Sequence, residues 1–82
     1  MFELYLVILL EYYEGREVPY SSSPDGIFNT LQSAKELAEQ LHNLFDKVII
    51  EKWNFMNDES WKLHSSIEYN DLLSNKTWEI HV

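Results

Sequence analysis

The sequence predicts an α+β fold in which a single helix packs on an antiparallel or mixed sheet, with the element order β-β-α-β-β-β. Two observations predict this class. Residues 30–45 repeat apolar side chains at helical spacing, whereas most of the remaining chain alternates polar and apolar residues or is rich in β-branched and aromatic ones. The length of 82 residues indicates one domain, spanning residues 1–82.

The first strand is expected over residues 2–13, where residues 4–10 form an unbroken apolar run. This run is shorter than the roughly 20 apolar residues that cross a bilayer. The first basic residue is Arg16, so the run also lacks the basic leader of a secretory signal. We therefore expect a central strand of a cytoplasmic protein.

The hairpin after this strand is assigned to Gly15, which can adopt the positive φ of a tight turn. A short second strand is expected over Glu17 to Ser21. Pro19 cannot donate a hydrogen bond to a neighbour, which favours an edge position for this strand. Residues 21–26 have the composition of a turn.

The helix is expected to begin at Leu31, with Thr30 as its N-cap, and to end at residues 46–47. Its apolar positions recur at helical spacing and form one stripe: Leu31, Ala34, Leu37, Ala38, Leu41, Leu44 and Phe45. This stripe predicts that the helix covers one face of the sheet.

The last part of the chain is expected to hold strands at 48–56, 61–69 and 77–82, with a turn at 57–60 and a loop or one helical turn at 70–76. Pairing Met56 with Trp61 gives a core-facing set of Ile50, Met56, Trp61, Leu63 and Ile67. Trp53 and Phe55 then lie on the opposite face, as a contact surface. A register error would exchange the two faces, and this alternative stays open.

No pattern in the sequence predicts catalysis. The chain has no cysteine, and His42, His64 and His81 do not have the spacing of a metal-binding motif. Asp58 and Glu59 are adjacent carboxylates in an expected open turn, where water keeps pKa values ordinary. We expect no enzyme, no catalytic residue, no metal and no cofactor.

The charge predicts a basic partner. Six basic and fourteen acidic residues give a net charge of −8, which disfavours direct binding to nucleic acid or to an anionic membrane. A basic protein surface would be attracted, although solubility alone could explain the charge. The predicted partner-binding residues are the spread carboxylates with the two aromatic residues above: Glu11, Glu14, Glu17, Glu36, Glu39, Glu51, Asp58, Glu59, Trp53 and Phe55.

The first strand is apolar on both of its sides. One side carries Phe2, Leu4, Leu6, Ile8 and Leu10, and the other carries Tyr5, Val7 and Leu9. A single helix covers only one of these sets. We expect the set Tyr5, Val7 and Leu9 to remain exposed and to form the interface of a two-fold homodimer.

Residues 1–56 resemble small uncharacterised bacterial and phage proteins built as hairpin, helix and strand. The resemblance rests on a Gly-aliphatic-aromatic stretch and a capped helix: Gly26, Ile27, Phe28, Thr30, Ala34, Lys35 and Ala38. It implies a phage or mobile-element accessory protein, which would act in the cytoplasm of the host cell, and it implies no reaction. Together with the charge, it leads us to expect a phage-encoded inhibitor, such as an anti-CRISPR, that occludes a basic surface of a host defence protein by steric and electrostatic means. The alternatives are a homodimeric structural or regulatory module and a small-ligand binder with a cleft between Trp61, Trp78 and the helix.

Overall fold

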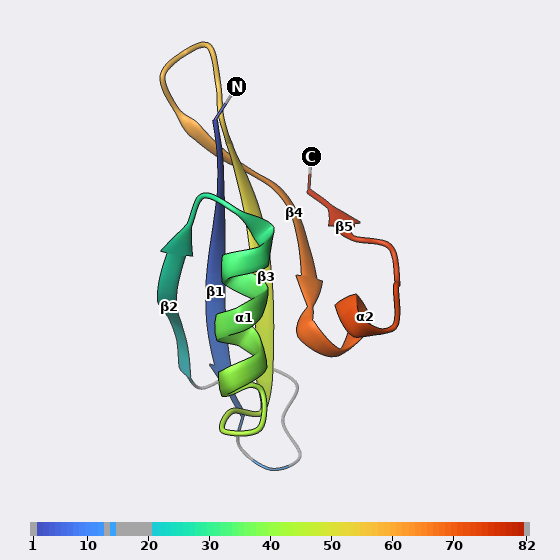
Figure 1. The fold of residues 1–82 in the computed structure, drawn as a ribbon. Helices are drawn as coiled ribbons and strands as arrows, with labels where there is room; N and C mark the ends of the chain where they lie inside the picture. The colour runs from blue at the N-terminus through green and yellow to red at the C-terminus, as the bar shows by residue number, and fades with distance from the viewer. Residues whose placement is uncertain (1, 13, 15–20, 82) are drawn as a thin grey trace.

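The computed structural model describes residues 2–12, 14 and 21–81 and shows one five-stranded antiparallel sheet with its main helix on one face (Figure 1). The elements follow in chain order: β1 Glu3–Glu11, β2 Ser21–Phe28, α1 Leu31–Leu41, β3 Lys47–Phe55, β4 Trp61–Glu68, α2 Tyr69–Leu73 and β5 Glu79–Ile80. The strands lie side by side as β2-β1-β3-β4-β5. The predicted α+β class is confirmed, with the short helix α2 between β4 and β5.

Strand β2 occupies the segment that the sequence predicted as a turn. It pairs with β1 from Tyr5↔Phe28 to Glu11↔Ser21, so the turn predicted at residues 21–26 is wrong. Pro24 is tolerated because β2 lies at the edge of the sheet and the pairing register shifts beside it. The strand predicted at Glu17 and the turn at Gly15 lie outside the described residues.

Helix α1 begins as predicted and ends earlier. The Thr30 hydroxyl accepts a hydrogen bond from the Ser33 backbone N–H at 3.3 Å, which confirms the N-cap. The helix ends at Leu41 rather than at residues 46–47, and Leu44, counted in the apolar stripe, is 72% exposed. The stripe therefore stops meeting the sheet before its apolar pattern ends.

The core lies between α1 and one face of the sheet, with α2 at its border. Its buried residues come from both helices and three strands: Val7, Leu9, Ala34, Ala38, Val48, Ile50, Ile67 and Tyr69. Both alanines are fully buried, and small side chains there let the helix approach the strands closely. Tyr5 packs against this cluster.

The expected dimer face is therefore wrong. Val7 and Leu9 are buried beneath α1, and Tyr5 lies on the same covered side. The reason is the pairing of β1 with β3, which sets Val7 beside Ile50 and Leu9 beside Val48 in the row that meets the helix. Since side chains alternate along a strand, the face without a helix carries the other set of β1 residues.

The hairpin of β3 and β4 contains an irregularity that the sequence did not reveal. Ile50 pairs with Ile67 as predicted, but the register shifts after Lys52, so that Phe55 rather than Met56 lies opposite Trp61. One extra residue on β4 reverses the alternation beyond it. Trp53 and Phe55 lie on the face away from the core, as predicted, whereas placing Trp61 and Leu63 in the core-facing set was wrong. Met56 follows Asn54 on the covered side but lies outside the core cluster.

Figure 1 shows β1, β3 and β4 continuing past α1 toward the turn at residues 57–60. In the part of the chain that the structure describes, no helix has the length and apolar character needed to span a membrane.

Candidate functional site: the open face of the sheet

The candidate site is the sheet face opposite α1, here called the open face. Both helices lie on the other side, because Tyr69 and Leu72 of α2 pack against the cluster that contains Ala34 and Ala38 of α1. Within residues 2–12, 14 and 21–81, no helix lies over the open face (Figure 1). Strand pairing gives its apolar members: Leu4, Leu6, Ile8, Leu10, Ile27, Ile49, Trp53, Phe55, Trp61 and Leu63. Leu10, at the end away from the turn at residues 57–60, is buried, so the exposed part of the face lies toward that turn.

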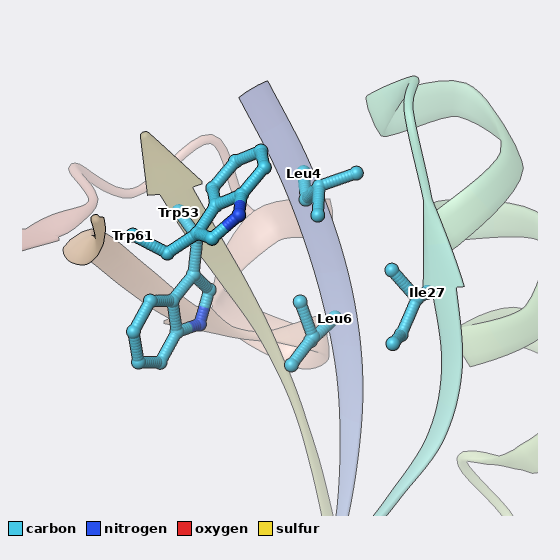
Figure 2. A pocket seen from close by; sticks show the side chains of 5 residues that line it. All are labelled: Leu4, Leu6, Ile27, Trp53 and Trp61. Atoms are coloured by element: carbon cyan, nitrogen blue, oxygen red, sulfur yellow. The ribbon is translucent and has the colours of Figure 1, made fainter. Parts of the chain in front are cut away.

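At the end nearer the turn at residues 57–60, the open face contains a shallow hollow of about 220 Å³. Five apolar or aromatic residues from four strands line it: Leu4, Leu6, Ile27, Trp53 and Trp61. Figure 2 shows the two indoles together on one side of the hollow, Ile27 on the other side and the two leucines between them. Ile27 is 63% exposed and Trp61 is 41% exposed, so a bound group could bury much more apolar surface here.

Aromatic contacts hold one wall of this hollow in place. The rings of Phe55 and Trp61 lie 5.1 Å apart between centroids, and the ring of Phe2 meets Phe55 edge-on at 6.4 Å. The Phe55 backbone N–H also donates to the Phe2 carbonyl at 2.9 Å. These contacts position the Trp61 indole before any partner arrives.

One carboxylate, that of Glu51, borders the hollow, and two others lie farther along the same face. The Trp53 indole N–H donates to Oε1 of Glu51 at 3.2 Å, and Glu51 pairs with Leu6 in the sheet. Across the sheet, Glu51 pairs with Ser66 of β4, and Ser66 pairs with Glu79 of β5. Glu68 of β4 pairs with Ile49 of β3. The open face thus combines an aromatic hollow with nearby negative charge.

The sequence found only part of this surface. Glu51, Trp53 and Phe55 were predicted partner-binding residues, and the structure brings them together on the open face. Leu4, Leu6 and Ile27 were missed. The alternation of β1 separated the two leucines from Val7, but it could not show which set the helix covers.

The other predicted partner-binding carboxylates do not join this surface. Glu36 and Glu39 are exposed on α1, and Asp58 and Glu59 lie in the turn beyond β3. Glu11 ends β1, at the end of the sheet away from that turn, and Glu14 is exposed beyond it (Figure 1). Glu17 lies outside the described residues. The predicted set is therefore divided between two faces and both ends of the sheet.

Asp58 has a structural contact of its own. Its Oδ1 accepts hydrogen bonds from the Ser60 hydroxyl at 2.5 Å and from the Ser60 backbone N–H at 3.2 Å. These two bonds lower the pKa of Asp58 below its ordinary value, because both stabilise the ionised form. The geometry gives Asp58 a role in holding the turn.

On the covered side of the sheet, the side chains of Glu3, Tyr5 and Lys52 form a cluster of polar contacts. Lys52 Nζ lies 3.3 Å from Glu3 Oε1, and the Tyr5 hydroxyl donates to Glu3 Oε2 at 3.2 Å. The bond to Lys52 is the main cause that lowers the pKa of Glu3, while burial and the Glu3 charge raise the pKa of Tyr5. These shifts arise from ordinary pairing along two neighbouring strands.

The histidines bond to neighbours in the sheet and helix. His64 and His81 are adjacent, since the His81 backbone N–H donates to the His64 carbonyl at 2.9 Å. A ring nitrogen of His81 lies 2.7 Å from the Ser66 hydroxyl, and His42 Nδ1 lies 2.7 Å from the Glu39 carbonyl. Among the described residues, no three His, Cys, Asp or Glu side chains are grouped as metal ligands would be.

The cleft suggested for a small ligand is not formed. Trp78 packs against the core cluster, whereas Trp61 lies on the open face. The two indoles are therefore separated by the sheet, and they do not enclose one site with α1.

No protein family, curated protein or solved structure matches this chain. The five residues that line the hollow carry no nucleophile and no group that titrates near neutral pH. This hollow offers a contact surface rather than reacting groups.

Proposed function

We propose that this protein is a non-catalytic binding protein that docks through its open face on a basic surface of another protein. The observation that supports this most directly is the uncovered sheet face, where Leu4, Leu6, Ile27, Trp53 and Trp61 form an apolar hollow. Large exposed apolar patches on small proteins usually mark interaction sites. Tryptophan is also enriched among residues that dominate binding energy.

A basic partner follows from the charge of the chain and of this face. The net charge is −8, and three carboxylates, Glu51, Glu68 and Glu79, lie with one cation, Lys47, on the face that holds the hollow. Opposite charge speeds association and aligns two surfaces, while desolvated aromatic contacts hold them together. In the form expected from the sequence, a phage-encoded inhibitor would use this surface to occlude a nucleic-acid-handling defence protein of its host.

A homodimer through the open face is the second candidate, because one apolar patch can serve both copies. Two chains of charge −8 repel each other, however, and a copy brings the same carboxylates to the interface. Light scattering over a dilution series separates the candidates. A dimer that persists at low micromolar concentration would replace the basic partner by a second copy.

Affinity capture with matched variants tests the proposal. Immobilised wild-type protein is incubated with a bacterial lysate, and bound proteins are identified by mass spectrometry. Ile27→Lys places a cation in the hollow on an edge strand, where lysine is well tolerated. Leu44→Lys makes the same change of charge at an exposed position outside the hollow.

The proposal predicts a basic protein that wild type and Leu44→Lys retain and Ile27→Lys loses. It also predicts weaker capture as salt increases, since exposed charges are screened. Equal capture by both lysine variants, or capture that does not respond to salt, would refute docking of a basic partner through this face.

A further inference from the structure

We infer that the hollow on the open face is an arginine-binding site that receives an exposed arginine side chain of the partner. This inference rests on the proposed function and names the group that the site recognises. The hollow is apolar and would favour an apolar ligand, whereas the carboxylate of Glu51 at its border would favour a cation. An arginine side chain has an apolar stem and a flat, charged end, and it fits both.

The aromatic lining suits a guanidinium group. Cations bind over the faces of aromatic rings, and tryptophan is the strongest such partner. Trp53 and Trp61 lie on the same side of the hollow, and Phe55 supports Trp61 at 5.1 Å. The methylene stem of the arginine would then lie on Leu4 and Leu6, between the indoles and Ile27 (Figure 2).

The charge is supplied by Glu51. Its carboxylate is tied to the indole of Trp53 by the 3.2 Å hydrogen bond, so it lies at the border of the hollow. A carboxylate has about four acceptor sites, and one indole N–H uses one of them. The remaining capacity matches a guanidinium, which presents several N–H donors in one plane. Glu68 and Glu79 add negative charge on the same face and favour the approach of a cation.

The same observations disfavour the other occupants. A purely apolar side chain would fill the hollow and leave Glu51 desolvated without a cation, which costs free energy. A second copy of the chain would bring its own carboxylates against this border. Lysine would satisfy the charge, but it lacks the planar end that stacks on an indole while pairing with a carboxylate.

Peptide binding followed by NMR tests the inference. The probe is acetyl-Gly-Arg-Gly-amide at millimolar concentration, and the matched probes replace arginine by citrulline, which is neutral and nearly isosteric, or by norleucine, which is apolar. The readout is the set of indole N–H signals of the 15N-labelled protein. Trp53 and Trp61 report on the hollow, and Trp78, packed against the core on the other side, is an internal control.

The expected result is a saturable shift of the Trp53 and Trp61 signals, with the Trp78 signal unmoved and with the arginine probe binding about fivefold more tightly than citrulline. Glu51→Gln keeps an acceptor for the indole N–H and removes the charge, so it is expected to abolish this preference. Glu36→Gln, on exposed α1, removes the same charge elsewhere and is expected to preserve it.

Three outcomes would overturn the inference: norleucine binding as tightly as arginine, an arginine preference that survives Glu51→Gln, or no shift of either indole signal. These outcomes are distinct from failure of the proposed function. If the peptides fail but capture of a basic protein is lost in Ile27→Lys and retained in Leu44→Lys, docking through the open face stands and only the arginine site is lost. If both lysine variants capture equally, the proposed function itself fails.

Discussion

Substituting two adjacent isoleucines of β3 tests which face of the sheet the helix covers. Ile50 is fully buried between Val7 and Ile67, whereas its neighbour Ile49 is half-buried on the open face beside Ile8. The change to alanine is the same at both positions and removes a β-branched side chain from the same strand. The difference between the two variants therefore isolates burial from strand propensity.

The magnitude follows from the groups removed. Ile50→Ala deletes three carbon groups, worth about 0.8 kcal/mol each when buried, and the cavity left behind adds to this transfer term. We expect a loss of about 3–4 kcal/mol in the free energy of unfolding for Ile50→Ala and about 1 kcal/mol for Ile49→Ala. For a domain of this size, the melting temperature would fall by about 15–25 °C and about 5 °C, respectively.

Urea unfolding followed by tryptophan fluorescence measures both changes. If Ile50→Ala does not fold, Ile50→Val gives the same comparison at a smaller cost of about 0.5–1.5 kcal/mol, with Ile49→Val as its control. A loss of stability for Ile49→Ala equal to or larger than the loss for Ile50→Ala would show that the open face is at least as buried as the covered face. The reasoning about the hollow would then be refuted.

Three further substitutions test the packing of β2 on α1, the N-cap of α1 and the ion pair between β1 and β3. Gly26→Ala would bring a methyl group to 2.9 Å from a Leu37 methyl carbon, so urea unfolding is expected to show a loss of about 1–3 kcal/mol; an unchanged midpoint would contradict this close approach. Thr30→Ala removes the N-cap and is expected to cost about 1 kcal/mol by the same measurement, whereas Thr30→Ser, which retains the hydroxyl, should cost much less. Because Lys52 lowers the pKa of Glu3, that pairing stabilises the protein above the ordinary glutamate value of 4.5 and is lost as the pH falls through the lowered pKa. Wild type should therefore lose stability more steeply than Glu3→Gln in acid titrations followed by circular dichroism, and parallel curves would refute the pairing.

Local patterns in the sequence predicted most of the elements and few of their relations. Thr30 and the alanines of α1 specified a capped helix with one close-packing side, because capping and helical spacing depend on residues a few positions apart. The segment at residues 21–26 was mistaken for a turn because its serine, proline and glycine residues favour turns. An edge strand tolerates such residues, and only pairing with β1 revealed it.

The sequence placed some residues of the candidate site on the correct face of the sheet and others on the wrong face. Trp53 and Phe55 were placed on the face away from the core by alternation along the strand from Ile50, which pairs with Ile67 as expected. Trp61 was placed on the wrong face because one extra residue in β4 reverses the alternation between Ile67 and the turn. A bulge changes no local propensity strongly enough to be seen in the sequence.

The sequence by itself determined that this is an acidic α+β chain with one main helix and a first strand apolar on both sides. These properties follow from composition and from periodicity along the chain. Only the tertiary structure decided which side of β1 the helix covers, burying Val7 and Leu9 and leaving Leu4 and Leu6 open. The physical reason is that both sides of the strand are similarly apolar, so the choice depends on long-range contacts. Val48 and Ile50 of β3 pair with Leu9 and Val7, and together they pack against the small side chains of α1. The aromatic hollow therefore lies on the other face of the sheet.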